Sequence, residues 1–249
     1  MISMSYRYVS ARTGVRAAAR VIAATLTILN VAACSDAASG LTASGAPSVP
    51  LRVINGAAVP VSVIIDGATR VTTLAPASIS EVVRVPEGAR RVELRPMSGA
   101  SATATLQASA GGTEPVLVAA TAVGSSSVGV LVLADTAPIP APGTSKLRVV
   151  HMASKAPPID VWRKQPDFPT PVRVAFPFLY GFTSGYIQSA PGTWELTVTP
   201  TDSLKKAGGA VGLPSELARL SLTTAADRAY TVVLLDAPDG VRLEVIDTP

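Results

Sequence analysis

The chain contains a single histidine, His151, in the stretch LRVVHMASKAPPIDVW at 147–162. A Ser-His-Asp hydrolase places an imidazole between a hydroxyl nucleophile and a carboxylate, and only His151 could fill that role. An earlier stretch, LRVINGAAVPVSVIIDG at 51–67, opens in the same way and has Asn55 where the histidine would stand. Asparagine and histidine can both bond a neighbouring loop from the end of a strand. We therefore expect His151 to be structural, with a hydrolase as the weaker alternative.

Metal and cofactor chemistry finds little support in the residue types. One histidine and one cysteine leave only oxygen ligands, and the aspartates lack the alternating spacing of a calcium loop. The segment DAPDG at 236–240 is typical of a β-turn. No glycine-rich phosphate loop stands between a strand and a helix. We expect no metal and no cofactor, and no enzymatic activity.

The aromatic residues are unevenly distributed. After residue 33 they all lie in the second half of the chain. Trp194 and Tyr230 lie in alternating segments, which predicts a core position. The others could fill the core, or form an exposed platform for a glycan or a partner protein, because aromatic side chains dominate recognition surfaces. The candidate ligand-binding residues are Trp162, Phe168, Phe176, Phe178, Tyr180 and Phe182. The last four have a spacing of two, so an extended chain would present them on one face.

The first 33 residues have the layout of an export signal. A basic stretch reaches Arg20, and the apolar run VIAATLTILNVAA that follows is shorter than the roughly 20 residues that span a bilayer. The run ends in Val31-Ala32-Ala33-Cys34, which resembles the bacterial lipobox. That resemblance implies lipidation of Cys34, the single cysteine of the chain. It also implies a membrane anchor through the N-terminal lipid. By the same resemblance to known lipoproteins, the serine at position 35 does not signal retention in the inner membrane.

The net charge of +4 does not indicate nucleic-acid binding. Four of the 21 basic residues lie in the first 33 positions, which hold no acid, and the rest equal the 17 acidic residues in number. A formally neutral body without a basic stripe lacks the electrostatic footprint for phosphate backbones. We expect no nucleic-acid partner.

Composition divides the chain into five segments. They are a lipoprotein signal peptide at 1–33, a flexible tether rich in Ser, Gly and Pro at 34–50, a first domain at 51–136, a Pro-rich linker at 137–146 and a second domain at 147–249. Each domain holds seven or eight short runs rich in Val, Ile, Leu and Thr, cut by turn residues every eight to twelve positions. This pattern predicts an all-β fold of two tandem immunoglobulin-like β-sandwich domains. The segment LPSELARL at 213–220 is the one predicted helix.

Three landmarks recur in order and indicate an internal repeat. LRVIN at 51–55 matches LRVVH at 147–151, and RRVELRP after Pro86-Glu87-Gly88 matches TWELTVTP after Pro191-Gly192. GVLVLADT at 129–136 matches GVRLEVIDT at 240–248. The second copy is longer by about 16 residues.

The second copy resembles the bacterial domain-of-unknown-function 4397 family. The resemblance is carried by LRVVHMASKAPPIDV, by LYGFTSGYIQSAPGTWELTVTP and by RAYTVVLL. The first copy keeps the turn Asp66-Gly67, but has Ser62 where the family pattern has aspartate and lacks the Ser-Gly-Tyr motif, so it is a degenerate copy. The resemblance implies a secreted or lipid-anchored all-β domain, and it supplies no biochemical activity.

These observations favour a lipid-anchored, non-enzymatic binding or interaction module of the cell envelope. We expect its location to be the outer membrane or cell surface, on the periplasmic or extracellular face. Its partners are expected to be the membrane, through the lipid, and a glycan or an envelope protein. The alternative is a purely structural spacer.

Overall fold

The computed structural model describes residues 47–109, 116–123, 127–133, 140–165, 168–201 and 215–248. Every regular element within these ranges is a β-strand, which confirms the all-β prediction. The predicted signal peptide, Cys34 and the predicted tether up to residue 46 lie outside the described residues. No helix long and apolar enough to cross a membrane occurs in the described part of the chain.

The first sandwich consists of two sheets. One sheet has the order β4-β1-β8-β9, with β5 also paired to β1, and the other has the order β3-β2-β6-β7. Its strands are β1 (Ser48–Asn55), β2 (Val61–Ile65), β3 (Ala68–Leu74), β4 (Ser78–Ile79), β5 (Val83–Pro86), β6 (Gly88–Pro96), β7 (Ala102–Ala108), β8 (Val116–Val123) and β9 (Ser127–Leu133). The first strand thus begins three residues before the predicted domain boundary.

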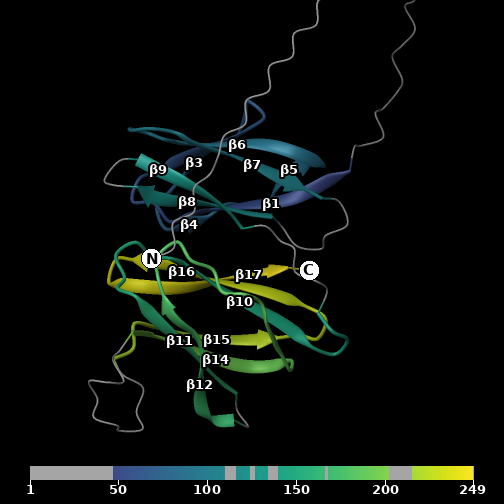
Figure 1. Cartoon of the computed structure of the whole chain (residues 1–249), viewed down its shortest axis with the longest axis vertical. Helices are drawn as coiled ribbons and strands as arrows, with labels where there is room; N and C mark the ends of the chain where they lie inside the picture. The colour runs from purple at the N-terminus through teal and green to yellow at the C-terminus, as the bar shows by residue number, and fades with distance from the viewer. Residues whose placement is uncertain are drawn as a thin grey trace, which may run out of the picture. The chain divides into compact units, whose positions relative to one another are not determined.

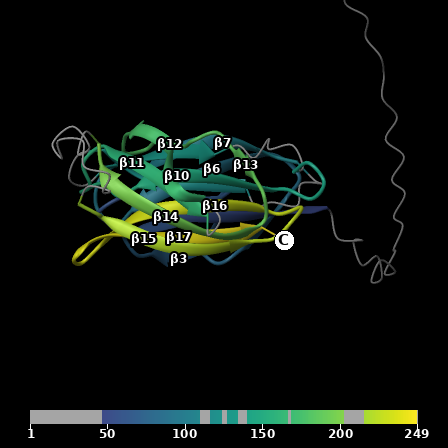
Figure 2. The same cartoon turned by 90° about the horizontal axis from the view of Figure 1, so that it is seen from below.

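The second sandwich has the same strand order, β13-β10-β16-β17 in one sheet and β12-β11-β14-β15 in the other (Figure 1). Its strands are β10 (Ser145–Met152), β11 (Ile159–Gln165), β12 (Phe168–Phe178), β13 (Ile187–Ser189), β14 (Gly192–Pro200), β15 (Ala218–Thr224), β16 (Ala229–Ala237) and β17 (Gly240–Thr248). Figure 2 shows these strands from below. In each sandwich the opening strand pairs in parallel with the second-last strand, β1 with β8 and β10 with β16.

The predicted helix at 213–220 is wrong for its described part. Residues from Ala218 onward open β15 and pair with β14, where Ala218 lies opposite Val198. Helix propensity is a weak preference, and the strand pairing outweighs it. The Asp66-Gly67 turn is present, with positive φ angles of 50° and 82° that suit the two-residue hairpin between β2 and β3.

Strand alternation builds one core in each sandwich. Inward residues of β1, such as Leu51 and Val53, pack in the first core, and the corresponding residues Leu147 and Val149 of β10 pack in the second. Trp194 and Tyr230 are buried in the second sandwich, as predicted.

A third apolar cluster joins the two sandwiches. Its buried members come from β1, β8 and β9 of the first sandwich and from β10, β16 and β17 of the second. They are Ile54, Ala119, Leu133, Val150, Met152, Val233, Leu235 and Ile246. Strand β10 therefore has a core on each face, and all eight of its residues are buried.

Candidate functional site

His151 is fully buried at the end of β10. Its Nδ1 accepts the N–H of Ala153 at 3.3 Å, and its ring lies 6.4 Å from that of Phe178. Burial lowers the pKa of His151. Nε2 makes no hydrogen bond of ordinary geometry. The Pro157 carbonyl nevertheless favours the protonated ring, which partly offsets the lowering of the His151 pKa. The imidazole is therefore enclosed by protein atoms in this structure.

Asn55 occupies the same place in the first sandwich and makes the corresponding contacts. Its Oδ1 accepts the N–H of Ala57 at 3.0 Å, two residues onward, as Nδ1 of His151 does with Ala153. Its Nδ2 donates to the carbonyl of Val59 at 3.0 Å, and to two further carbonyls at Leu74 and Ala75. Both side chains thus fold back the loop that follows the opening strand.

A serine completes the edge of each opening strand. The Oγ of Ser184 accepts the N–H of Val149 at 2.8 Å, and its own N–H donates to the Val149 carbonyl at 2.8 Å. Ser80 makes the same pair of bonds with Val53, at 2.9 and 2.8 Å. The sequence analysis missed Ser80 because no Gly-Tyr follows it. The serine of the Ser-Gly-Tyr motif in the second sandwich and Ser80 in the first sandwich thus have the same structural role.

The outward face of the β12-β11-β14-β15 sheet carries a polar and aromatic cluster around Trp162. The indole Nε1 of Trp162 donates to Oγ1 of Thr199 at 3.0 Å, and the guanidinium of Arg173 lies 5.7 Å from the indole ring centroid. Arg173 also forms an ion pair with Asp160 at 3.2 Å, and Thr201 donates to the same carboxylate at 3.1 Å. Hereafter these five residues are called the Trp162 cluster.

Burial within the Trp162 cluster is graded. The Asp160 side chain is 3% exposed, whereas that of Arg173 is 37% exposed. Thr199 is fully buried although it lies on the outward face. Trp162 itself is half-buried. The carboxylate and the hydroxyls thus hold the indole and the guanidinium in place at the surface.

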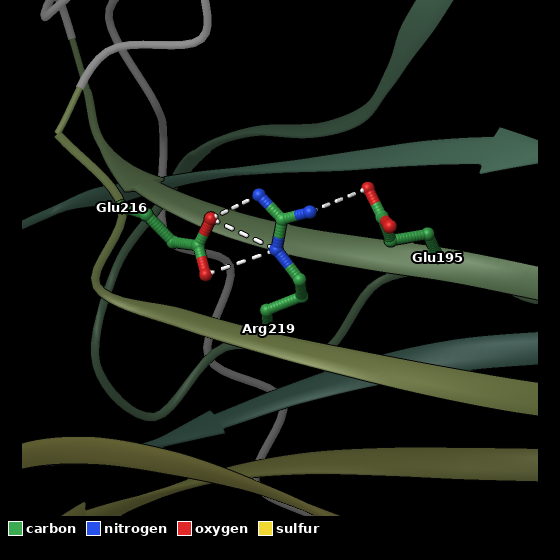
Figure 3. Close-up of polar contacts among 3 residues, drawn as sticks. All are labelled: Glu195, Glu216 and Arg219. Carbon is green, nitrogen blue, oxygen red and sulfur yellow. Dashed lines mark hydrogen bonds and ion pairs between the residues drawn. The ribbon is translucent and has the colours of Figure 1, made fainter. Parts of the chain in front are cut away.

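A second charged group lies on the same sheet. The guanidinium of Arg219 lies between the carboxylates of Glu216 and Glu195 (Figure 3). Its Nη2 is 2.5 Å from Glu216 and its Nη1 is 2.9 Å from Glu195. Hydrogen bonding to Arg219 lowers the pKa of Glu216, and the same bond raises the pKa of Arg219. The one guanidinium of Arg219 thus forms an ion pair with each of the two carboxylates.

The first sandwich lacks an equivalent of the Trp162 cluster. The shared register of β2 with β6 and of β11 with β14 places Ser62 at the position of Asp160 and Ile64 at that of Trp162. Ile64 is 6% exposed. The first sandwich has the Arg95–Glu93 ion pair on the equivalent face, so the aromatic part of the outward face distinguishes the second sandwich in the described residues.

Four of the six predicted aromatic residues have described side chains, and these four do not lie on one face. Phe178 is buried in the second core, and β12 ends there. Gly181, with φ of 79°, turns the chain, so Tyr180 and Phe182 do not continue the strand. Phe182 is 57% exposed. Phe168 and Phe176 lie in β12, with side chains outside the described part of the structure.

Tyr180 reaches the first sandwich. Its hydroxyl donates to the carbonyl of Gly56 at 2.9 Å and accepts the N–H of Ala122 at 2.6 Å. Burial raises the pKa of Tyr180, and the Ala122 N–H opposes this shift. The sequence gives no signal for this role, because both partners are backbone atoms of the other sandwich.

Loops at one end of the second sandwich line a half-open pocket of ≈ 320 Å³. Its apolar lining includes Leu217 and Val241, and its polar lining includes Lys155, Glu216 and Asp239. Glu216 is already held by Arg219. None of the predicted aromatic residues lines this pocket. No group of three or more His, Cys, Asp or Glu residues that could hold a metal ion occurs in the described ranges.

One known family model matches part of the chain. The profile of DUF4397, a domain of unknown function, matches residues 49–162. The match runs from β1 to β11 and ends at Trp162. It thus covers the first sandwich, whose motifs are the weaker ones, and only the first two strands of the second. No curated protein matches the chain.

Several solved structures share strand arrangements with the chain at low identity. One is a Bacteroides uniformis protein provisionally described as a cell adhesion protein, with 11% identity and a TM-score of 0.25 over 80% of this chain and 96% of that one. Another is the tip fimbrial protein Mfa3 from Porphyromonas gingivalis, with 10% identity and a TM-score of 0.25 over 81% and 98%. The Bacillus anthracis TIE protein is similar at 7% identity and a TM-score of 0.24, over 81% and 44%. Likeness at this level supports no inference about a ligand.

Proposed function

We propose that this chain is a non-enzymatic, lipid-anchored binding protein of the bacterial cell envelope, and that its second sandwich is a further copy of the DUF4397 domain and carries the ligand-binding face. The observation that carries the binding role is the Trp162 cluster. A half-buried indole and a partly exposed guanidinium, both held by a buried carboxylate and threonine hydroxyls, form a preorganised recognition surface. The first sandwich has small or aliphatic residues at the two corresponding positions of β2.

A glycan or an envelope protein is the ligand class that fits such a surface. The flat indole offers apolar area to a sugar ring, and the adjoining guanidinium and hydroxyls offer polar contacts. The enclosed state of His151 argues against the hydrolase alternative. The outer membrane or the cell surface is the proposed location.

The binding role is tested with Trp162→Ala in the full chain, assayed on an array of bacterial envelope glycans. We expect the wild type to retain one glycan class and the variant to lose about tenfold in affinity, or about 1.4 kcal/mol. Phe182→Ala, which removes an exposed ring outside the cluster, is the matched control and is expected to bind as the wild type does. Equal binding by Trp162→Ala and the wild type would remove the proposed face.

The anchoring role is tested separately with Cys34→Ala. If Cys34 carries the lipid, the wild type partitions into detergent with the membrane fraction and the variant does not. Retention of the variant in the detergent phase would contradict lipidation at this residue.

A spacer function is the second candidate, and one observation favours it. The third apolar cluster and the Tyr180 contacts hold the two sandwiches to each other. A spacer of this kind would bind no glycan on the array, whatever residue stands at position 162.

A further inference from the structure

The two sandwiches meet through equivalent residues. Residues of the two sandwiches are equivalent when they hold the same place in the strand pairing. For example, Ile54 lies opposite Ala119 in the first sandwich as Val150 lies opposite Val233 in the second. Six of the eight buried residues in the third cluster form three such pairs. The pairs are Ile54 with Val150, Ala119 with Val233, and Leu133 with Ile246.

One contact joins a position to its own equivalent. Gly56 follows Asn55 as Met152 follows His151, so these two residues correspond. A Cβ atom on Gly56 would lie 2.7 Å from Cε of Met152 and 2.9 Å from its carbonyl oxygen. In a contact with two-fold symmetry, a residue that touches its own equivalent lies at the axis. The axis of this contact therefore passes close to Gly56 and Met152.

Polar contacts flank this axis. Tyr180, from the segment after β12, binds backbone atoms of Gly56 and Ala122. Arg242 of β17 donates in turn to the carbonyl of Ala77, which precedes β4, at 2.6 Å. Each sandwich thus contributes an edge segment to the contact. These bonds are not equivalent to each other, so the symmetry is confined to the apolar centre.

We propose that the outward face of the β13-β10-β16-β17 sheet is a self-complementary interaction surface whose partner is the equivalent face of a second domain of the same type. In the intact chain, the first sandwich is that partner, and the contact is an isologous pair within one polypeptide. The pair makes the described residues one cooperative folding unit, because uncovering either face would expose the third cluster to water. A chain whose internal contact is broken presents the same face to a second chain.

The test exchanges the two residues at the axis in the full chain. Gly56→Met introduces a second side chain where there is no room, so we expect the single calorimetric transition of the wild type to split into two. The opened variant is expected to dimerise in sedimentation at micromolar concentration. The double variant Gly56→Met/Met152→Gly places one methionine at the axis from the opposite side. It should recover a single transition and at least about half of the decrease in melting temperature that Gly56→Met causes.

Gly185→Ala is the matched control, because a Cβ there meets nothing within 4 Å. It is expected to melt as the wild type does. A double variant no more stable than Gly56→Met would overturn the two-fold relation, even if the single variant does not fold. A Gly56→Met variant that melts in one transition at the wild-type temperature would also overturn it. So would an opened variant that stays monomeric.

Discussion

At the scale of single residues, the structure explains why one fold position holds histidine in one copy and asparagine in the other. Asn55 and His151 each accept the N–H two residues onward. Each also lies near the carbonyl of a residue that precedes a proline, Val59 or Pro157. The amide makes three donor bonds, whereas the imidazole has fewer partners and is titratable. The second sandwich thus gains a pH-sensitive group in its core where the first has none.

That difference predicts an acid-labile second sandwich. Because the pKa of His151 is lowered in the folded state, the unfolded chain binds the proton more readily below the ordinary value of 6.5. The contribution to stability is complete above pH 6.5 and is lost as the pH falls through that value. We expect His151→Asn to remove this loss, at a cost of about 1–2 kcal/mol at neutral pH from reduced packing. Urea unfolding between pH 8 and pH 5 measures both effects, and a variant with the wild-type pH slope would contradict the assignment.

At the scale of elements, the alternation of apolar and polar residues predicted the strands and the turns well. The repeat of LRVIN and LRVVH also predicted which residues occupy equivalent places, and the shared strand order of the two sandwiches agrees with it. The helix at 213–220 failed because local propensity cannot register the pairing partner that β14 supplies to Ala218. The extended course on which a shared face for the spacing-two row depends ends at Phe178, where β12 ends, and Gly181 has a positive φ in the turn that follows.

The candidate site shows the same limit. Sequence reasoning selected Trp162 because of its residue type, but Arg173 and Thr199 join it only through the pairing of β11 with β12 and β14. Asp160 lies in the segment LRVVHMASKAPPIDV that carries the family resemblance, yet its role as the buried partner of Arg173 depends on a residue 13 positions later, on the neighbouring strand. Contacts across strands follow from register, which the apolar pattern fixes only in part.

At the scale of the whole described body, contact between the sandwiches changes what each one exposes. The third cluster covers the faces around β10 and β16, so a partner molecule can reach only the outward sheets, the edges and the loop ends. The Trp162 cluster lies on such an outward sheet. Phe182 lies at an edge, beside the segment that carries Tyr180. A ligand bound at the Trp162 cluster would leave the contact between the sandwiches intact.

Tyr180 makes that contact sensitive to alkali. Burial raises its pKa, so the unfolded chain loses the phenolic proton more readily once the pH exceeds the ordinary value of 10. The stabilisation is complete below pH 10 and is lost as the pH rises through that value toward the folded-state pKa.

Tyr180→Phe removes the titration, and it leaves the Gly56 carbonyl and the Ala122 N–H without their partner, at a cost of about 1–3 kcal/mol. Hydrogen exchange at the β1 and β10 amides measures the loss at pH 7, and unfolding at pH 9 to 11 measures the titration. Tyr230→Phe, which removes a phenol hydroxyl from the core of the second sandwich, serves as the control. Unchanged exchange in Tyr180→Phe would show that the third cluster holds the sandwiches together without the hydroxyl.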